Sequence, residues 1–167
     1  MRWSRFAVFV LIVTVLQASL VDIFAVTRLN IKPDLLLILL VFFSIYSDTT
    51  EAIITSFTIG FAADIIGPAI GPQMLSFGIF GTLLAYLHRV ITIKKFLYKS
   101  VAIFITGFLA GVLAYFLTFL KGEPTASNVY AVLFGTCLYS SLAGPFLFLP
   151  SAWWMRIKTH RFGRRQA

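Results

Sequence analysis

Long apolar blocks recur from one end of this chain to the other, and only short polar stretches separate them. Of the 167 residues, 59% are hydrophobic and 12% are charged, whereas a soluble domain is about a quarter charged. No stretch is polar enough to form a separate soluble domain of ~100 residues. The sequence therefore predicts a single all-α domain, residues 1–167, that is embedded in a membrane.

Six of these apolar blocks approach the length of a membrane span. A spanning helix needs ~20 largely apolar residues, with ~17 as a working minimum. The predicted spans are residues 6–24, 31–47, 52–67, 73–91, 100–120 and 129–150, of which the second and third are short. The first block is interpreted as an uncleaved helix, because Leu16 stands where a signal peptide needs a small residue. We expect a compact bundle of six transmembrane helices.

The basic residues lie between or beyond the apolar blocks and give a net charge of +8. This distribution argues against nucleic-acid binding and favours a role in topology and contact with lipid headgroups. If the N-terminus is cytoplasmic, eleven of the 14 lysines and arginines fall on that side of the membrane. We therefore expect both termini in the cytoplasm, with a basic tail over residues 153–167 and with Trp153 and Trp154 at the interface.

An aspartate interrupts the third apolar block, in the stretch TIGFAADIIGPAIGP. A charge at the centre of a bilayer costs ~2.5–3.5 kcal/mol on insertion scales, so Asp64 is a candidate site residue. Gly60, Ala63, Asp64 and Gly67 share one helical stripe, and small residues of this kind face another helix. Asp64 is interpreted as a helix-to-helix hydrogen bond or salt bridge, with a ligand or proton site and a snorkelling side chain as alternatives.

A second aspartate stands directly before an apolar run, in NIKPDLLLILLVFF. Pro33 and Asp34 suit the first turn of a helix, where a carboxylate complements the positive end of the helix dipole. The expected topology also places Asp34, Asp64 and Asp22 at a similar depth near the outer surface. The same residues thus allow a second interpretation, an outward-facing pocket lined by carboxylates.

Other residues indicate packing more than chemistry. Gly107 and Gly111 have the GxxxG spacing that lets two helices approach closely, either within the chain or between chains. The lone Cys137 has no neighbouring ligands for a metal. Because the sequence carries no catalytic motif and no nucleotide-binding loop, we expect no enzymatic activity, no metal and no cofactor.

Two motifs in order resemble the rod shape-determining protein MreD family. They are KPDLLLILLVFF, a Pro-Asp pair before a leucine run, and GFAADIIGPAIGP, a Gly-x-x-x-Asp pattern followed by Gly-Pro and further glycines. The number of spans, the short loops and the basic C-terminal end are also similar, so the likeness covers the whole chain. The motif positions carried over are Pro33, Asp34, Gly60, Asp64 and Gly67.

The resemblance implies a non-enzymatic scaffold of the bacterial cell-elongation machinery, located in the inner membrane. Implied partners are an MreC-like single-span protein, MreB filaments, and the peptidoglycan synthase pair of RodA and a class B penicillin-binding protein. The family also resembles the S components of energy-coupling-factor transporters, which bind vitamins in an outward pocket. A substrate-binding subunit of a small-molecule transporter is therefore the alternative. The first span lacks the i, i+4 alanine pair with which S components dock, and this counts against transport.

Overall fold

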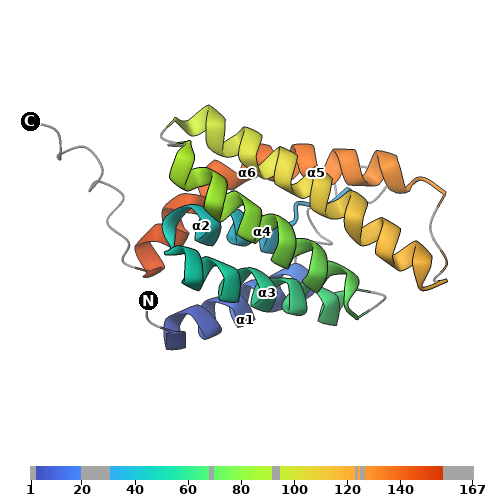
Figure 1. The fold of residues 1–167 in the computed structure, drawn as a ribbon, viewed down its shortest axis with the longest axis horizontal. Helices are drawn as coiled ribbons and strands as arrows, with labels where there is room; N and C mark the ends of the chain where they lie inside the picture. Colours follow the sequence, from blue (N-terminus) through green and yellow to red (C-terminus); the bar gives the residue numbers. More distant parts are fainter. Residues whose placement is uncertain are drawn as a thin grey trace, which may run out of the picture.

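Six helices make up the described part of the chain, and no strand occurs in it (Figure 1). The computed structural model describes residues 3–19, 31–67, 70–91, 95–122, 124 and 127–155. The helices are α1 (Trp3–Ser19), α2 (Leu35–Tyr46), α3 (Thr49–Ile66), α4 (Pro72–Val90), α5 (Phe96–Leu120) and α6 (Val129–Met155). The prediction of an all-helical chain is confirmed.

Successive helices run in opposite directions along the long axis of the molecule (Figure 1). At one end, which we call the Lys99 end, Lys99 near the start of α5 donates a hydrogen bond to the hydroxyl of Tyr46, the last residue of α2, at 2.6 Å. Trp154 of α6 also donates to the carbonyl of Arg5 in α1 there, at 3.4 Å. At the opposite end, the Asp64 end, α1, α3 and α5 finish and α2, α4 and α6 begin.

Helix α2 forms the centre of the bundle and contacts all five other helices. Ten of its twelve residues, Leu36 through Ile45, are buried on every side of the helix. A helix that is apolar all round is stable only when it is surrounded. Twelve residues extend about 18 Å, well short of the ~30 Å hydrocarbon core of a bilayer. The second apolar block is therefore a core helix of the bundle as well as a predicted span.

Aromatic side chains hold the Lys99 half of α2 against its neighbours. Phe43 meets Phe6 of α1 edge to face, with ring centroids 4.9 Å apart. Phe42 meets Phe148 of α6 edge to face at 5.5 Å. Such pairs contribute about 0.5–1.5 kcal/mol beyond the burial of their area. These contacts hold the second half of α2 against α1 and α6.

Three of the six helices, α3, α5 and α6, are long and apolar enough to cross a membrane by length and composition. Helices α1 and α2 are shorter apolar helices. The prediction of six spans stays a prediction. Residues 20–24 of the first predicted span lie outside the described residues, as does the basic tail beyond Met155.

Two helix ends differ from the limits of the predicted spans. The helix of the second block begins at Leu35, four residues after Ile31, because Asp34 is its N-cap in extended conformation. The last helix continues through Pro150 to Met155, so Trp153 and Trp154 belong to α6 and not to a tail. A proline removes only one backbone donor, and packed membrane helices tolerate this. On the same turn, the Ser151 hydroxyl donates to the carbonyl of Leu147 at 2.8 Å.

Candidate functional site

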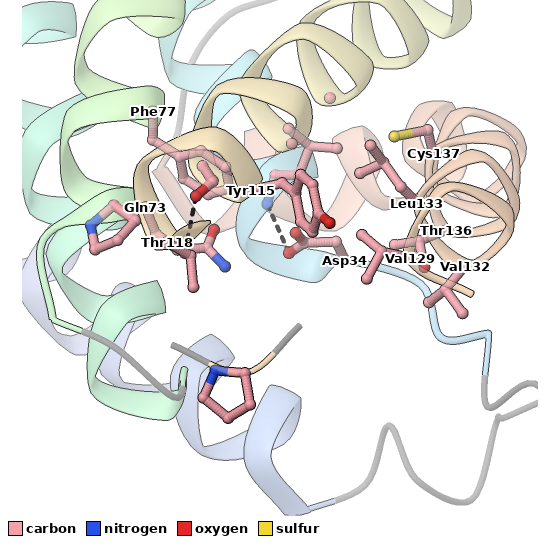
Figure 2. Close-up of a pocket in the computed structure, with 16 residues that line it drawn as sticks. Asp34, Gln73, Phe77, Tyr115, Thr118, Val129, Val132, Leu133, Thr136 and Cys137 are labelled. Atoms are coloured by element: carbon pink, nitrogen blue, oxygen red, sulfur yellow. Dashed lines mark hydrogen bonds between the residues drawn. The ribbon is translucent and has the colours of Figure 1, made fainter. Parts of the chain in front are cut away.

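A cavity of about 480 Å³ lies among α2, α4, α5 and α6 toward the Asp64 end (Figure 2). Its lining residues come from the start of α2, the first turns of α4, the second half of α5, a single loop residue and the first half of α6. In that order they are Asp34 and Leu37; Pro72, Gln73 and Phe77; Gly107, Gly111, Ala114, Tyr115 and Thr118; Pro124; and Val129, Val132, Leu133, Thr136 and Cys137. The walls are mostly apolar, with a few polar groups among them.

Asp34 enters this cavity as the N-cap of α2. Its Oδ1 accepts the N–H of Leu37 at 3.0 Å, the bond drawn in Figure 2, and it lies 3.5 Å from the amide nitrogen of Gln17. A helix start leaves backbone N–H groups without partners, and inside a membrane no water is present to satisfy them. The cap therefore accounts for a carboxylate placed before an apolar run.

Two more side chains complete the start of α2. The Oε1 of Gln17 accepts the N–H of Leu35 at 2.8 Å, and the hydroxyl of Ser140 accepts the N–H of Asp34 at 2.8 Å. Ser140 is fully buried and follows the first residue of α6 by eleven positions, roughly 16 Å along that helix. Asp34 is thus half-buried among α1, α2 and α6, and its expected level near the outer surface of the membrane stays a prediction. Pro33 precedes the N-cap and is buried.

Asp64 forms a second cap, between two helices. Its Oδ2 accepts the N–H groups of Gly71 at 2.8 Å and Met74 at 3.0 Å, and its Oδ1 accepts that of Gln73 at 2.9 Å. These are backbone donors at the start of α4, where Pro72 has none to offer. The side chain is 1% exposed, so the carboxylate stands in for the water that the helix start would otherwise need. A carboxylate at a helix N-terminus also complements the helix dipole.

The glycines around Asp64 allow this cap to form. A Cβ at Gly60 would lie 2.7 Å from the Cα of Met74 and 2.9 Å from the carbonyl oxygen of Gln73, so α3 and α4 touch backbone to backbone there. Gly71, the N-cap of α4, has φ +115°, which L residues rarely adopt. Gly67 ends α3, and its N–H bonds the carbonyls of Ala63 and Asp64. The small-residue stripe therefore faces α4.

The GxxxG face of α5 packs within the same chain. A Cβ on Gly107 would strike the side chain of Leu37 in α2 and lie 3.2 Å from the Sγ of Cys137 in α6. A Cβ on Gly111 would strike Leu133 of α6. These glycines let α5 approach α2 and α6, and both line the cavity. At these two positions, the close approach that the GxxxG spacing predicts is made to helices of the same chain.

The two aspartates that the sequence singles out have separate neighbours. Asp34 lines the cavity, while Asp64 is absent from its described lining and touches it through Pro72 and Gln73, which its cap helps to place. Asp22 lies outside the described residues. Of the two described carboxylates in the second interpretation, a pocket lined by carboxylates, Asp34 lines the cavity and Asp64 does not.

Three residues that complete these caps were not singled out from the sequence. Gly71 carried a signal, because a Gly-Pro pair before an apolar run marks a turn that opens a helix. Gln17 and Ser140 carried none, since they lie 17 and 106 positions from Asp34 and only the packing of α1 and α6 brings them to it.

The described residues offer little for metal chemistry. Within the described ranges, no three His, Cys, Asp or Glu side chains come together as metal ligands. Cys137 is a buried free thiol whose sulfur faces the glycine of α5. The arrangement holds helix ends in place and borders a cavity of mixed polarity.

Comparison with known proteins gives one family. The model of the rod shape-determining protein MreD family matches residues 1–158 of the 167-residue chain. No curated protein and no solved structure matches the chain significantly. The matched range covers all six helices, both helix caps and the cavity. The chain belongs to the rod shape-determining protein MreD family of membrane proteins.

Proposed function

We propose that this protein is a non-enzymatic scaffold of the bacterial cell-elongation machinery in the inner membrane, where it binds an MreC-like single-span partner. The observation that carries the proposal is the family match over residues 1–158, which implies a role in rod shape determination. RodA, a class B penicillin-binding protein and MreB filaments are further proposed partners. The caps that Asp34 and Asp64 form on α2 and α4 suit a scaffold. A rigid bundle can bind a partner without the free-energy cost of ordering its surface.

The proposed orientation places the Lys99 end in the cytoplasm and the Asp64 end toward the periplasm. It follows from the distribution of lysines and arginines, which are more numerous on the cytoplasmic side of membrane proteins. Both termini would then be cytoplasmic, and six helices would cross the membrane. The bulk of an MreC-like partner lies in the periplasm, so the Asp64 end would be on its side.

In this proposal Asp64 contributes to partner binding indirectly. Its carboxylate is 1% exposed and is used by three N–H groups of α4, so it offers no surface to a partner. It holds the Asp64 end of α4 in place. Exposed apolar residues lie on α4 and just before it, such as Ile70, Leu75 and Ile79. These side chains would shift if the start of α4 lost its cap.

The test is co-purification of the full-length protein with an MreC-like partner from detergent, combined with rescue of rod shape in cells depleted of their own MreD. We expect Asp64→Leu to lose the partner and to leave cells round. The matched control is Asp48→Leu, since Asp48 is an exposed N-cap of α3 whose side chain makes no capping bond.

Folding is monitored by size-exclusion chromatography of each variant. A folded Asp64→Leu protein that retains the partner and restores rod shape would refute the role given to this carboxylate. Failure of the wild-type protein to retain an MreC-like partner would refute the scaffold proposal as a whole.

A further inference from the structure

The cavity has the size and shape of a site for a small organic molecule. Ligand sites in proteins usually measure about 300–1,000 Å³ and are apolar clefts with a few convergent polar groups. This cavity measures about 480 Å³ and is a partly open cleft bordered by four helices. Leu37, Phe77, Val132 and Leu133 contribute apolar wall, and Thr118, Thr136 and Gln73 contribute hydrogen-bonding groups.

Asp34 supplies the only charge among the described lining residues. Its two described hydrogen bonds, from Leu37 and Gln17, both end on Oδ1. The carboxylate also lines the cavity, where its oxygens can accept a hydrogen bond from a bound molecule. A carboxylate beside apolar walls is costly unless a positive group or hydrogen-bond donors accompany it. The cavity therefore favours a cation and disfavours an anion.

Two aromatic rings add to this preference. Phe77 of α4 and Tyr115 of α5 both line the cavity, and Figure 2 shows Tyr115 and Asp34 among the side chains drawn there. Aromatic faces attract ammonium groups, by about 0.5–2 kcal/mol depending on desolvation. They also pack against planar apolar groups of a ligand.

We propose that this cavity binds a small organic amine, in which a protonated amino group pairs with Asp34 and an apolar or aromatic body fills the space between Phe77 and Leu133. The proposal goes beyond the scaffold function and does not depend on any protein partner. Since the cap of Asp64 places Pro72 and Gln73 in the wall, the same hydrogen bonds that fix α4 also shape this site.

The experiment measures binding of three matched probes to the full-length protein in phosphatidylcholine nanodiscs, with empty nanodiscs subtracted. The probes are 2-phenylethylamine, the neutral 2-phenylethanol and the anionic 3-phenylpropionate. We expect saturable binding of the amine, with the alcohol weaker by about ten-fold or more because a charge-assisted hydrogen bond is lost. The anion should show no saturable binding.

Variants separate the cavity from the lipid. Asp34→Asn should weaken the amine by about ten-fold or more, while the helix start is kept because asparagine caps as well as aspartate. Asp48→Asn, the same change outside the cavity, should leave binding unchanged. Val132→Phe should abolish binding by filling the space, and Val132 takes no part in the described hydrogen bonds at the start of α2.

The proposal is overturned if the amine shows no saturable binding above empty nanodiscs, or if the three probes bind equally. It is also overturned if Val132→Phe, folded by its thermal midpoint, binds the amine like the wild type. If Asp34→Asn fails to fold, the comparison of the three probes and Val132→Phe decide the question. None of these outcomes bears on retention of an MreC-like partner, so the two proposals fail separately.

Discussion

The carboxylate of Asp64 and the backbone of Gln73 join the end of α3 to the beginning of α4, with Oδ1 of Asp64 accepting the N–H of Gln73 at 2.9 Å. Gln73 also lines the cavity. A single side chain thus closes a helix hairpin and shapes the wall of a neighbouring site. Because Asp64 is buried, the bond is shielded from competing water.

Removal of the Asp64 carboxylate should destabilise the protein strongly. Asp64→Leu leaves three N–H groups at the start of α4 without their acceptor, and each buried unsatisfied group costs about 1–3 kcal/mol. We expect a loss of about 3 kcal/mol or more in the free energy of unfolding, measured by denaturant titration in detergent micelles. Asp64→Asn, which keeps one acceptor oxygen, should lose less.

The control for this prediction is Asp48→Leu, which should change the free energy of unfolding by no more than about 0.5 kcal/mol. Its side chain makes no capping hydrogen bond and is exposed. Equal losses for Asp64→Leu and Asp48→Leu would contradict the assignment of Asp64 as the cap of α4.

Gln17 and Asp34 should act together at the start of α2. Asp34→Ala is expected to cost about 1–2 kcal/mol as a lost N-cap, and Gln17→Met removes the acceptor of the Leu35 N–H. Because the two side chains share one helix start, we expect a coupling energy of about 0.5 kcal/mol or more in a double-mutant cycle. Strict additivity of the two losses would show that the residues act separately.

A methyl group at Gly60 should push α3 and α4 apart. Its nearest neighbours would be the Cα of Met74 and the carbonyl oxygen of Gln73, and backbone atoms cannot move aside as a flexible side chain can. Overpacking of this kind costs about 1–3 kcal/mol. Gly67→Ala is the comparison, since its nearest atom would lie at 3.3 Å. Thermal midpoints in detergent should rank Gly60→Ala well below Gly67→Ala.

The GxxxG face of α5 should respond to changes in α2. Gly107→Ala is expected to destabilise the protein because its methyl group would strike Leu37. Leu37→Ala alone should cost about 2–5 kcal/mol as a large-to-small core substitution. In the double variant the clash is gone, so the combined loss should fall below the sum of the single losses by about 0.5 kcal/mol or more. A sum that is fully additive would place the Gly107 contact elsewhere.

Much of the fold could be predicted from local patterns. Apolar blocks of helical length indicated all six helices, and the small residues around Asp64 indicated a helix contact there. Both signals are local. A helix makes its backbone hydrogen bonds within its own segment, and a stripe of small residues is recognised from the spacing of those residues along one helix. The place of Asp34 at a helix start was predictable too, because its capping bond goes to Leu37, three residues on. The continuation of α6 through Pro150 was less predictable, since a tolerated proline depends on neighbouring helices.

Local patterns could not predict whether Asp34 and Asp64 line the same cavity. A pocket lined by Asp22, Asp34 and Asp64 was the second interpretation, and of the two that are described, Asp34 lines the cavity and Asp64 does not. The N–H of Asp34 is accepted by the hydroxyl of Ser140, 106 positions away, and no local pattern encodes that contact.

The order of residues was enough to show that this chain is a helical membrane protein, and it held the motifs that resemble the MreD family, because composition and helical period are properties of short segments. It could not show that α2 is the core of the bundle, that Asp64 caps α4, or that Asp34 opens onto a cavity. Those features arise where segments far apart in the chain meet, and in the absence of water each buried N–H and carboxylate must find its partner there.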